Sequence, residues 1–213
     1  SEITLADIES QSLNPTAMAI SNSKLYVCNG NEVLVFDAQN LTLLNTIKQF
    51  KKGTTEINFN QLTSINIYNG RIYIGTQESR LFILDETTLE GFSVLGNGQW
   101  WQTFVHVFGV AVNDDFIFVK EKEQTIKVFE TAAVTETSSW NLSPVAKLTT
   151  KTGGTENYNL KVENGNLVVA GRNANSFLYY NIEYIKSNAA RSLEVKAIEP
   201  RISTINSKPI ALS

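Results

Sequence analysis

Hydrophobic and polar positions alternate along this chain in short runs that polar turns separate. The clearest case is residues 24–37, KLYVCNGNEVLVFD, where apolar runs at 25–27 and 33–36 flank the turn Asn29-Gly30-Asn31. β-branched and aromatic residues that alternate with polar ones around an Asn-Gly turn are the strongest short-range signal for a β-hairpin. The pattern therefore predicts two antiparallel strands joined at this turn.

The same hairpin pattern recurs down the chain. Its first apolar residue is Leu25, Ile72, Phe116 and Leu167 in successive copies, at intervals of 44 to 51 residues. Another short apolar run precedes each hairpin and a fourth follows it, clearly in the first two copies and more weakly in the last two. The preceding runs lie at 17–20, 64–67, 109–112 and 159–162, and the following runs at 41–47, 89–95, 145–148 and 193–198. Four strands in about 40–50 residues is the period of a β-propeller blade.

Burial explains why such units pack around an axis. A four-stranded blade has two apolar faces, and radial packing covers both while leaving only short edges. A β-sandwich with hairpins at similar spacing is the alternative. A sandwich gives no reason for the hairpins to align residue by residue, so the propeller is favoured.

The two ends of the chain match parts of the repeat. Residues 204–208 repeat the pattern of residues 19–24, and residues 2–7 resemble residues 32–37. We therefore expect one all-β domain over residues 1–213, a five-bladed β-propeller whose last blade is shared by the terminal strands. The expected blades span 15–50, 61–99, 106–150, 157–199, and 200–213 together with 1–10. An open four-bladed array and a truncated longer propeller are the competing arrangements.

Three polar segments interrupt the repeat. Residues 48–60, with Lys48, Lys51 and Lys52, are expected to form a solvated loop between the first two blades. The KEKE run at 120–123 is expected to be a solvated turn at the tip of the third hairpin. Residues 181–191, after the fourth hairpin, are polar enough to form a helical turn at the rim, where function tends to vary.

Composition narrows the class of partner. The net charge is −3 with both signs interspersed, so the chain lacks the basic stripe that a nucleic acid backbone requires. No apolar run approaches the roughly 20 residues that span a bilayer. The single cysteine, Cys28, is expected to be a small buried hydrophobe rather than a reactive thiol.

The chain begins at Ser1, which either Met removal or excision of a leader would leave, and we favour an extracellular, envelope or virion-surface location over the cytoplasm.

The best candidate site is the mouth of the central channel, where the innermost strands begin. Aligning these strands places Gln61, His106 and Glu156 at equivalent positions, with Tyr158 and Arg201 two residues further in. Arg172 lies in the long turn of the fourth hairpin. The candidate ligand- or partner-binding residues are Gln61, Trp100, Trp101, His106, Glu156, Tyr158, Arg172 and Arg201.

The segment that contains Trp100 and Trp101 links the second and third blades. Successive side chains on a strand point to opposite sides, so the two tryptophans cannot both face the same way. An exposed tryptophan indicates contact with a ligand, a partner or a sugar ring. The alternative is that both fill a gap between blades.

The remaining chemistry argues against catalysis. The innermost strands carry no carboxylate, whereas a glycosidase needs two facing acids, and only Glu156 and Glu199 come near. One histidine and one cysteine exclude a histidine-rich metal site and a Cys/His nucleophile. Asp37, Asp85 and Glu130 are expected to cap the turns after their strands rather than bind calcium. We expect no cofactor, no metal and no catalytic residue.

Three stretches carry a family resemblance: KLYVCNGNEVLVFD, GRIYIGTQESRLFILD and GNLVVAGRNANSFLYYN. They resemble the repeats of bacterial YVTN/NHL-like propellers, and LVIVD-type surface proteins are the most similar. The third repeat departs most, with Asn113-Asp114-Asp115 in place of the Asn-Gly turn. The resemblance covers nearly the whole chain and implies the propeller fold. Members range from adhesion and scaffolding proteins to lyases and sugar-binding modules, so it implies no activity.

These observations favour a non-enzymatic recognition propeller, a bacterial envelope or viral surface module. The rim loops at 99–106 and 170–176 would present side chains to a protein partner or a glycan. One alternative is a structural subunit that forms an oligomer through Trp100 and Trp101. The other is a carbohydrate-active enzyme that uses Glu156 and Glu199.

Overall fold

The computed structural model describes residues 13–98, 104–122, 125–136, 142–149, 158–171, 176–189 and 203–204. These residues form four antiparallel sheets of four strands each and one two-stranded hairpin. Blade one contains β1 (Pro15–Ser21), β2 (Lys24–Asn29), β3 (Glu32–Asp37) and β4 (Leu43–Ile47). Blade two contains β7 (Leu62–Tyr68), β8 (Arg71–Thr76), β9 (Leu81–Asp85) and β10 (Gly91–Leu95). Blade three contains β11 (Val107–Val112), β12 (Phe116–Glu121), β13 (Thr125–Glu130) and β14 (Ala146–Thr149). Blade four contains β15 (Tyr158–Glu163), β16 (Asn166–Gly171), β17 (Ser176–Asn181) and β18 (Ser203–Thr204).

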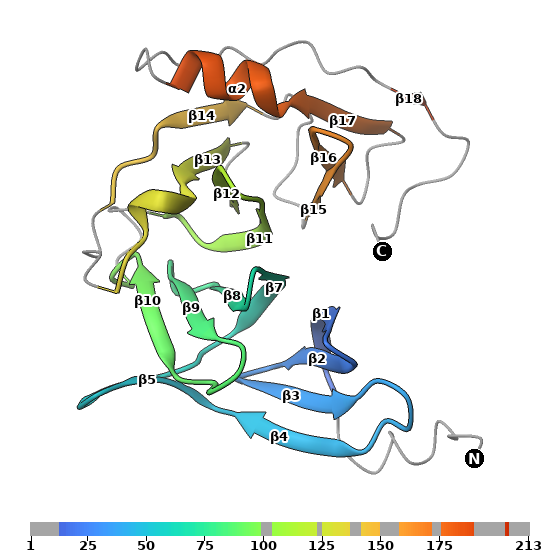
Figure 1. The fold of residues 1–213 in the computed structure, drawn as a ribbon, viewed down its shortest axis with the longest axis vertical. Coiled ribbons are helices and arrows are strands. Elements are labelled where there is room, and N and C mark those ends of the chain that lie inside the picture. The colour runs from blue at the N-terminus through green and yellow to red at the C-terminus, as the bar shows by residue number, and fades with distance from the viewer. Residues whose placement is uncertain are drawn as a thin grey trace.

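The four sheets are arranged as the blades of a β-propeller. In each sheet the strands pair in chain order, and the first strands β1, β7, β11 and β15 face the inner side of the array (Figure 1). Successive first strands contact one another from blade one to blade four. The expected all-β propeller is confirmed, and the sandwich alternative is wrong. Four blades are present in the described residues, so the expected fifth is not shown.

Alternating side chains place the core between the blades. In β9, Phe82 and Leu84 pack toward blade one, whereas Leu81 and Ile83 pack toward blade three. Three apolar clusters fill the three junctions between successive blades in this way. Burial on both faces explains why strands such as LFIL are continuously apolar rather than alternating.

The end of the chain differs from the expectation. Ser203 and Thr204 fall in the expected fifth blade at 200–213, but they pair with Phe177 and Ser176 as the outermost strand of blade four. The physical reason is that the outer edge of β17 presents backbone groups that need a partner. The predicted outer strand at 193–198 and the predicted ring closure between residues 3–5 and 210–212 lie outside the described residues.

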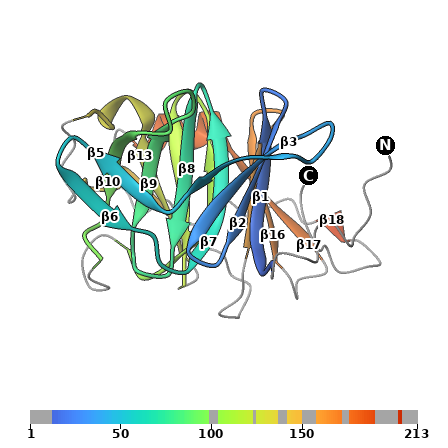
Figure 2. The same cartoon turned by 90° about the horizontal axis from the view of Figure 1, so that it is seen from below.

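The segment between blades one and two is a hairpin, not the solvated loop that we expected. It contains β5 (Gln49–Lys52) and β6 (Thr55–Asn58), and it lies beside β10 (Figure 2). Phe50 and Phe59 are buried, with ring centroids 5.6 and 5.1 Å from that of Phe82. Lys52 donates a hydrogen bond to the Phe92 carbonyl at 2.7 Å, so this lysine holds the hairpin against blade two.

The expected helical turn after β17 is the helix α2 (Ile182–Ala189). The Asn181 side chain accepts a hydrogen bond from the Tyr184 amide at 2.8 Å, as an N-terminal cap does. Ile182 and Ile185 pack into the cluster between blades three and four. In the part of the chain that the structure describes, no helix has the length and apolar character to cross a membrane.

Two of the three acids expected to cap turns do so. The Asp37 carboxylate accepts hydrogen bonds from the Gln39 and Asn40 amides, and the Asp85 carboxylate accepts those of Thr87 and Thr88. These bonds hold the pKa of Asp85 below its ordinary value, the Thr88 amide having the largest effect. Glu130 makes no such bond before the short 3₁₀ helix η1 (Thr131–Ala133), so its predicted capping role is wrong.

Cys28 provides a test of the packing between blades one and two. It is buried, its Sγ lies 3.9 Å from the Ser64 carbonyl oxygen, and burial raises the pKa of its thiol from 9.0 to about 12. We expect the folded chain to react with a disulfide reagent at neutral pH at least about a hundredfold more slowly than the chain in urea. Equal rates would contradict this packing.

Because the folded-state pKa is raised, Cys28 contributes stability below pH 9.0 that is lost as the pH rises toward 12.

Candidate functional site

Two residues of the predicted site lie, as expected, at the end of the propeller where the innermost strands begin. Gln61 and His106 are described with their side chains, and they directly precede β7 and β11. Tyr158 is the first residue of β15, and only its backbone is described. The other predicted site residues lie outside the described residues: Trp100, Trp101, Glu156, Arg172 and Arg201.

Gln61 and His106 are structurally equivalent, as the alignment predicted. Both adopt the left-handed backbone conformation, with φ of 48° and 52°. The Gln61 amide donates to Asn31 Oδ1 at 2.8 Å, and the His106 amide donates to Ser79 Oγ at 3.3 Å. Asn31 and Ser79 lie between the second and third strands of the preceding blade. The backbone at each position therefore links one blade to the next, which is a structural role.

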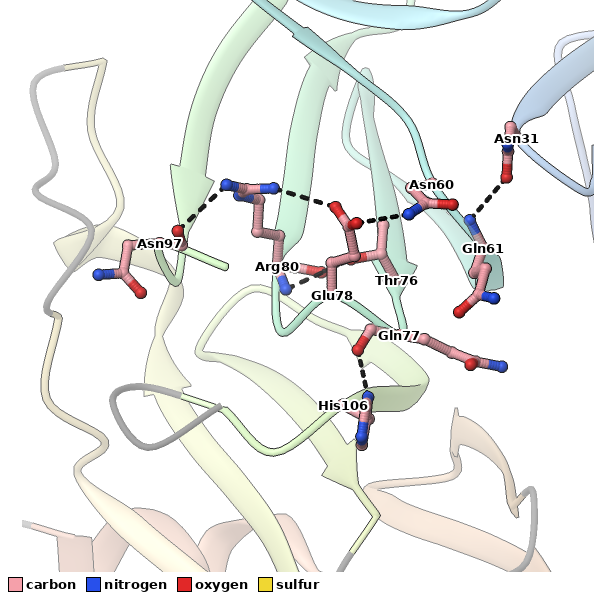
Figure 3. Close-up of polar contacts among 9 residues, drawn as sticks. All are labelled: Asn31, Asn60, Gln61, Thr76, Gln77, Glu78, Arg80, Asn97 and His106. Atoms are coloured by element: carbon pink, nitrogen blue, oxygen red, sulfur yellow. Dashed lines mark hydrogen bonds and ion pairs between the residues drawn. The ribbon is translucent and has the colours of Figure 1, made fainter. Parts of the chain in front are cut away.

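The Gln77 backbone connects these two positions. Its amide donates to the Gln61 carbonyl at 3.0 Å, and its carbonyl oxygen contacts Nδ1 of His106 (Figure 3). A carbonyl oxygen only accepts hydrogen bonds, so Nδ1 carries the proton at this contact. In the neutral ring Nε2 is then an acceptor. The arrangement fixes the orientation of the only histidine in the sequence.

Two threonines further in link the innermost strands. Thr16 Oγ1 donates to the Leu62 carbonyl at 2.8 Å, and Thr63 Oγ1 donates to the Val107 carbonyl. The equivalent residue of blade three is Phe108, which has no hydroxyl to donate. Thr16 and Thr63 thus hold neighbouring blades together, and the composition of the predicted mouth did not indicate this.

Sequence reasoning missed an ion pair at the tip of the hairpin between β8 and β9. The Arg80 guanidinium lies 3.2 Å from Glu78 Oε2 and donates to the Asn97 carbonyl at 3.1 Å (Figure 3). The Asn60 amide group donates to the other oxygen of the Glu78 carboxylate. Oppositely charged residues two apart in a hairpin turn were the available signal. The ion pair therefore holds the segment before β7, through Asn60, and the segment after β10, through Asn97.

The first half of the KEKE run is not a solvated turn. Lys120 and Glu121 belong to β12 and are 0% and 2% exposed, so the expectation is wrong for these two residues, whereas Lys122 is exposed after the strand. Glu121 Oε1 accepts hydrogen bonds from Lys127 Nζ and from the Val105 amide, each at 2.8 Å. β12 lies between blades two and four, and every residue of the strand is buried, including Lys120 and Glu121 at its end. Glu121 consequently fixes the backbone that leads to His106.

The described part of this site offers hydrogen-bonding groups and a fixed imidazole. The exposed residues at the mouth include Gln61 and Gln77, and His106 is partly exposed. No group of three or more His, Cys, Asp or Glu residues that could hold a metal ion occurs in the described ranges. Chemically, this arrangement can donate and accept hydrogen bonds to a polar ligand.

Comparison with known proteins supports the fold class. No protein-family model and no curated protein matches this chain. The crystal structure of the computationally designed Ika8 protein has a TM-score of 0.52 and 13% identity, over 80% of this chain and 46% of that one. The crystal structure of the computationally designed Ika4 protein has a TM-score of 0.51 and 14% identity, over 81% of this chain and 93% of that one. The chain thus spans less than half the length of Ika8, and identities this low show the fold alone. The fold and these likenesses define the class as an all-β, β-propeller-like protein.

The threonine link between innermost strands can be tested by Thr63→Val. This change keeps the shape of the side chain but removes the hydroxyl that donates to the Val107 carbonyl. We expect a loss of about 1 kcal/mol in the free energy of unfolding, measured by urea denaturation. Thr55→Val, at an exposed position of β6, is the control and should change stability by less than about 0.5 kcal/mol. Equal effects of the two changes would count against the link.

Proposed function

We propose that this chain is a non-enzymatic recognition propeller that presents one end of its blades to a protein partner or a glycan. The supporting observation is the mouth formed by Gln61, Gln77 and His106. Their backbones are held by hydrogen bonds within and between blades, while their side chains are wholly or partly exposed. A site ordered before binding loses less conformational entropy when its ligand arrives.

The chemistry of the mouth is that of hydroxyl or amide recognition. Amide side chains both donate and accept hydrogen bonds, and so complement sugar hydroxyls and peptide groups. In this proposal Trp100 and Trp101 supply the apolar contact, and Glu156, Tyr158, Arg172 and Arg201 extend the polar rim. The location that suits this role is a bacterial envelope or a virion surface.

A second candidate function, that of a structural subunit, is favoured by the face of blade one. Met18 and Ile20 on β1 are 74% and 71% exposed. The equivalent residues of the other three blades pack against the preceding blade: Ile65, Ile67, Val110, Val112, Leu160 and Val162. Blade one therefore carries the same apolar pattern without comparable burial. In a structural subunit another chain would cover it, whereas in the five-bladed arrangement the chain's own terminal strands would do so.

The recognition proposal can be tested with the double variant Trp100→Ala/Trp101→Ala on a glycan array. We expect the parent chain to bind one class of glycan and the variant to lose at least about thirtyfold in affinity, because buried tryptophans dominate binding sites. Trp140→Ala, outside the rim loops, is the matched control, and the melting temperature should be unchanged in all three. Unaltered glycan binding by the double variant would exclude the rim, and its loss of assembly instead would support the structural subunit. Hydrolysis of the bound glycan would show an enzyme.

The structural alternative has its own test in Met18→Ser/Ile20→Ser. If another chain covers this face, these changes should convert an assembly into monomers in sedimentation velocity, because each apolar side chain loses its burial. Tyr184→Ser, at an exposed position of α2, is the control. A parent chain that sediments as a monomer would rule out self-assembly through this face.

A further inference from the structure

A cavity of about 230 Å³ opens between blades two and three, away from the mouth. It lies at the end of β7, whereas Gln61 precedes the start of that strand, so the full length of the blade separates the two places. Its lining includes Tyr68, Arg71, Tyr73, Phe92, Asp114 and Thr131. Aromatic rings with a few polar groups that converge on one space are typical of ligand sites.

One wall is held rigid by two contacts of Arg71. Its guanidinium carbon lies 4.1 Å from the centroid of the Phe92 ring, and its Nη1 pairs with the Asp85 carboxylate. The guanidinium is planar and retains further N–H donors beyond the one used for Asp85. The wall is therefore a flat surface that can also donate hydrogen bonds.

Tyr73 supplies a hydroxyl group to the largely buried wall of the cavity. The residue is 4% exposed and lines the cavity, and no described residue shares a hydrogen bond with its hydroxyl. Burial raises the pKa of Tyr73 to about 12, with smaller effects from the Arg71 charge and from Tyr68. The hydroxyl therefore stays protonated at neutral pH and can donate a hydrogen bond. A tyrosine hydroxyl both donates and accepts hydrogen bonds, so this one is available to a ligand in the cavity.

The opposite side of the cavity adds an acceptor. Asp114 shares a hydrogen bond with the Tyr68 hydroxyl, which raises the pKa of Tyr68. Asp114 is exposed, and Thr131 lies nearby at the start of η1. Donors and acceptors therefore surround the cavity on more than one side.

Size and charge narrow the class of ligand. Drug-sized ligands and nucleotides occupy roughly 300–1,000 Å³, which is more than this cavity holds. Arg71 is already neutralised by Asp85, and Asp114 adds a negative charge, so the site disfavours phosphate and other anions. A compact neutral ring with several hydroxyl groups satisfies both limits.

We propose that this cavity binds a single neutral pyranose ring, with Tyr73 and Arg71 donating to its hydroxyls and Asp114 accepting from one of them. Aromatic walls pack against the apolar C–H groups of such a ring, and the polar groups fix its orientation. The site is formed by residues other than those of the mouth, so it stands even if the rim binds nothing.

The test is an NMR titration of the ¹⁵N-labelled chain with glucose, galactose, mannose and N-acetylglucosamine, each alone. We expect at least one of them to shift the amide signals around Tyr68, Arg71 and Asp114. Tyr73→Phe removes only the unpartnered hydroxyl and should weaken this binding about tenfold. Asp114→Asn should also weaken it, and it provides a second variant at an exposed position that leaves the core unchanged. Tyr184→Phe, on α2, is the matched control and should bind like the parent.

Three results would overturn the proposal. The first is no response to any of the four sugars, and the second is equal binding by the parent and Tyr73→Phe. The third is a response at these amides to inorganic phosphate but not to sugar, which would show an anion site instead. Amide shifts confined to residues beside Gln61 and His106 would place the sugar at the mouth, in favour of the rim and against this cavity.

Discussion

Each blade of this propeller buries both faces of its sheet, and the rest of the structure depends on this constraint. In a blade with a neighbour on each side, alternate side chains of a strand enter two different cores. In β8, Tyr73 packs toward blade three and Ile74 packs toward blade one. Space at these junctions is tight. A methyl group at Gly75 would overlap Ser64 of the same blade and Val107 of blade three, so glycine stands where Val107 packs against blade two. The apolar junctions supply the main driving force, and hydrogen bonds at the ends of the strands set how neighbouring blades align.

Hydrogen bonds between blades fix the backbone at the described part of the mouth. Apolar packing does not specify how far one blade slides along the next, whereas a hydrogen bond between blades does. Asn31 and Ser79 accept hydrogen bonds from the backbone amides of Gln61 and His106, and the Thr63 hydroxyl donates to Val107 in the first strand of the next blade. Gln61 and His106 were predicted as parts of a binding site because they align between repeats. Their alignment has a structural cause, and the side chains that remain exposed are the ones available for recognition.

Hairpins and their repeat could be predicted from the sequence because each depends on neighbouring residues. The Asn-Gly turn, the burial of Cys28 and the turns capped by Asp37 and Asp85 all follow from local chemistry. Features that depend on distant segments were missed. Glu121 is buried because its strand is enclosed by neighbours, and the β5–β6 hairpin forms because Phe50 finds Phe82 in the next blade. The polar character of the KEKE and QFKKGTTEINFN stretches concealed both outcomes.

Departures from the repeat locate the cavity between blades two and three. The turn between the first and second strands is Asn69-Gly70 in blade two and Asn164-Gly165 in blade four, but blade three has Asn113-Asp114-Asp115 at this place, and Asp114 lines the cavity. On the outer side Glu130 does not cap its turn as Asp37 and Asp85 do, and η1 brings Thr131 and Val134 to the same space. A repeat that packed as regularly here as elsewhere would present no such combination of polar groups. The regular part of each blade builds the scaffold, and the irregular part of blade three makes this junction chemically different from its neighbours.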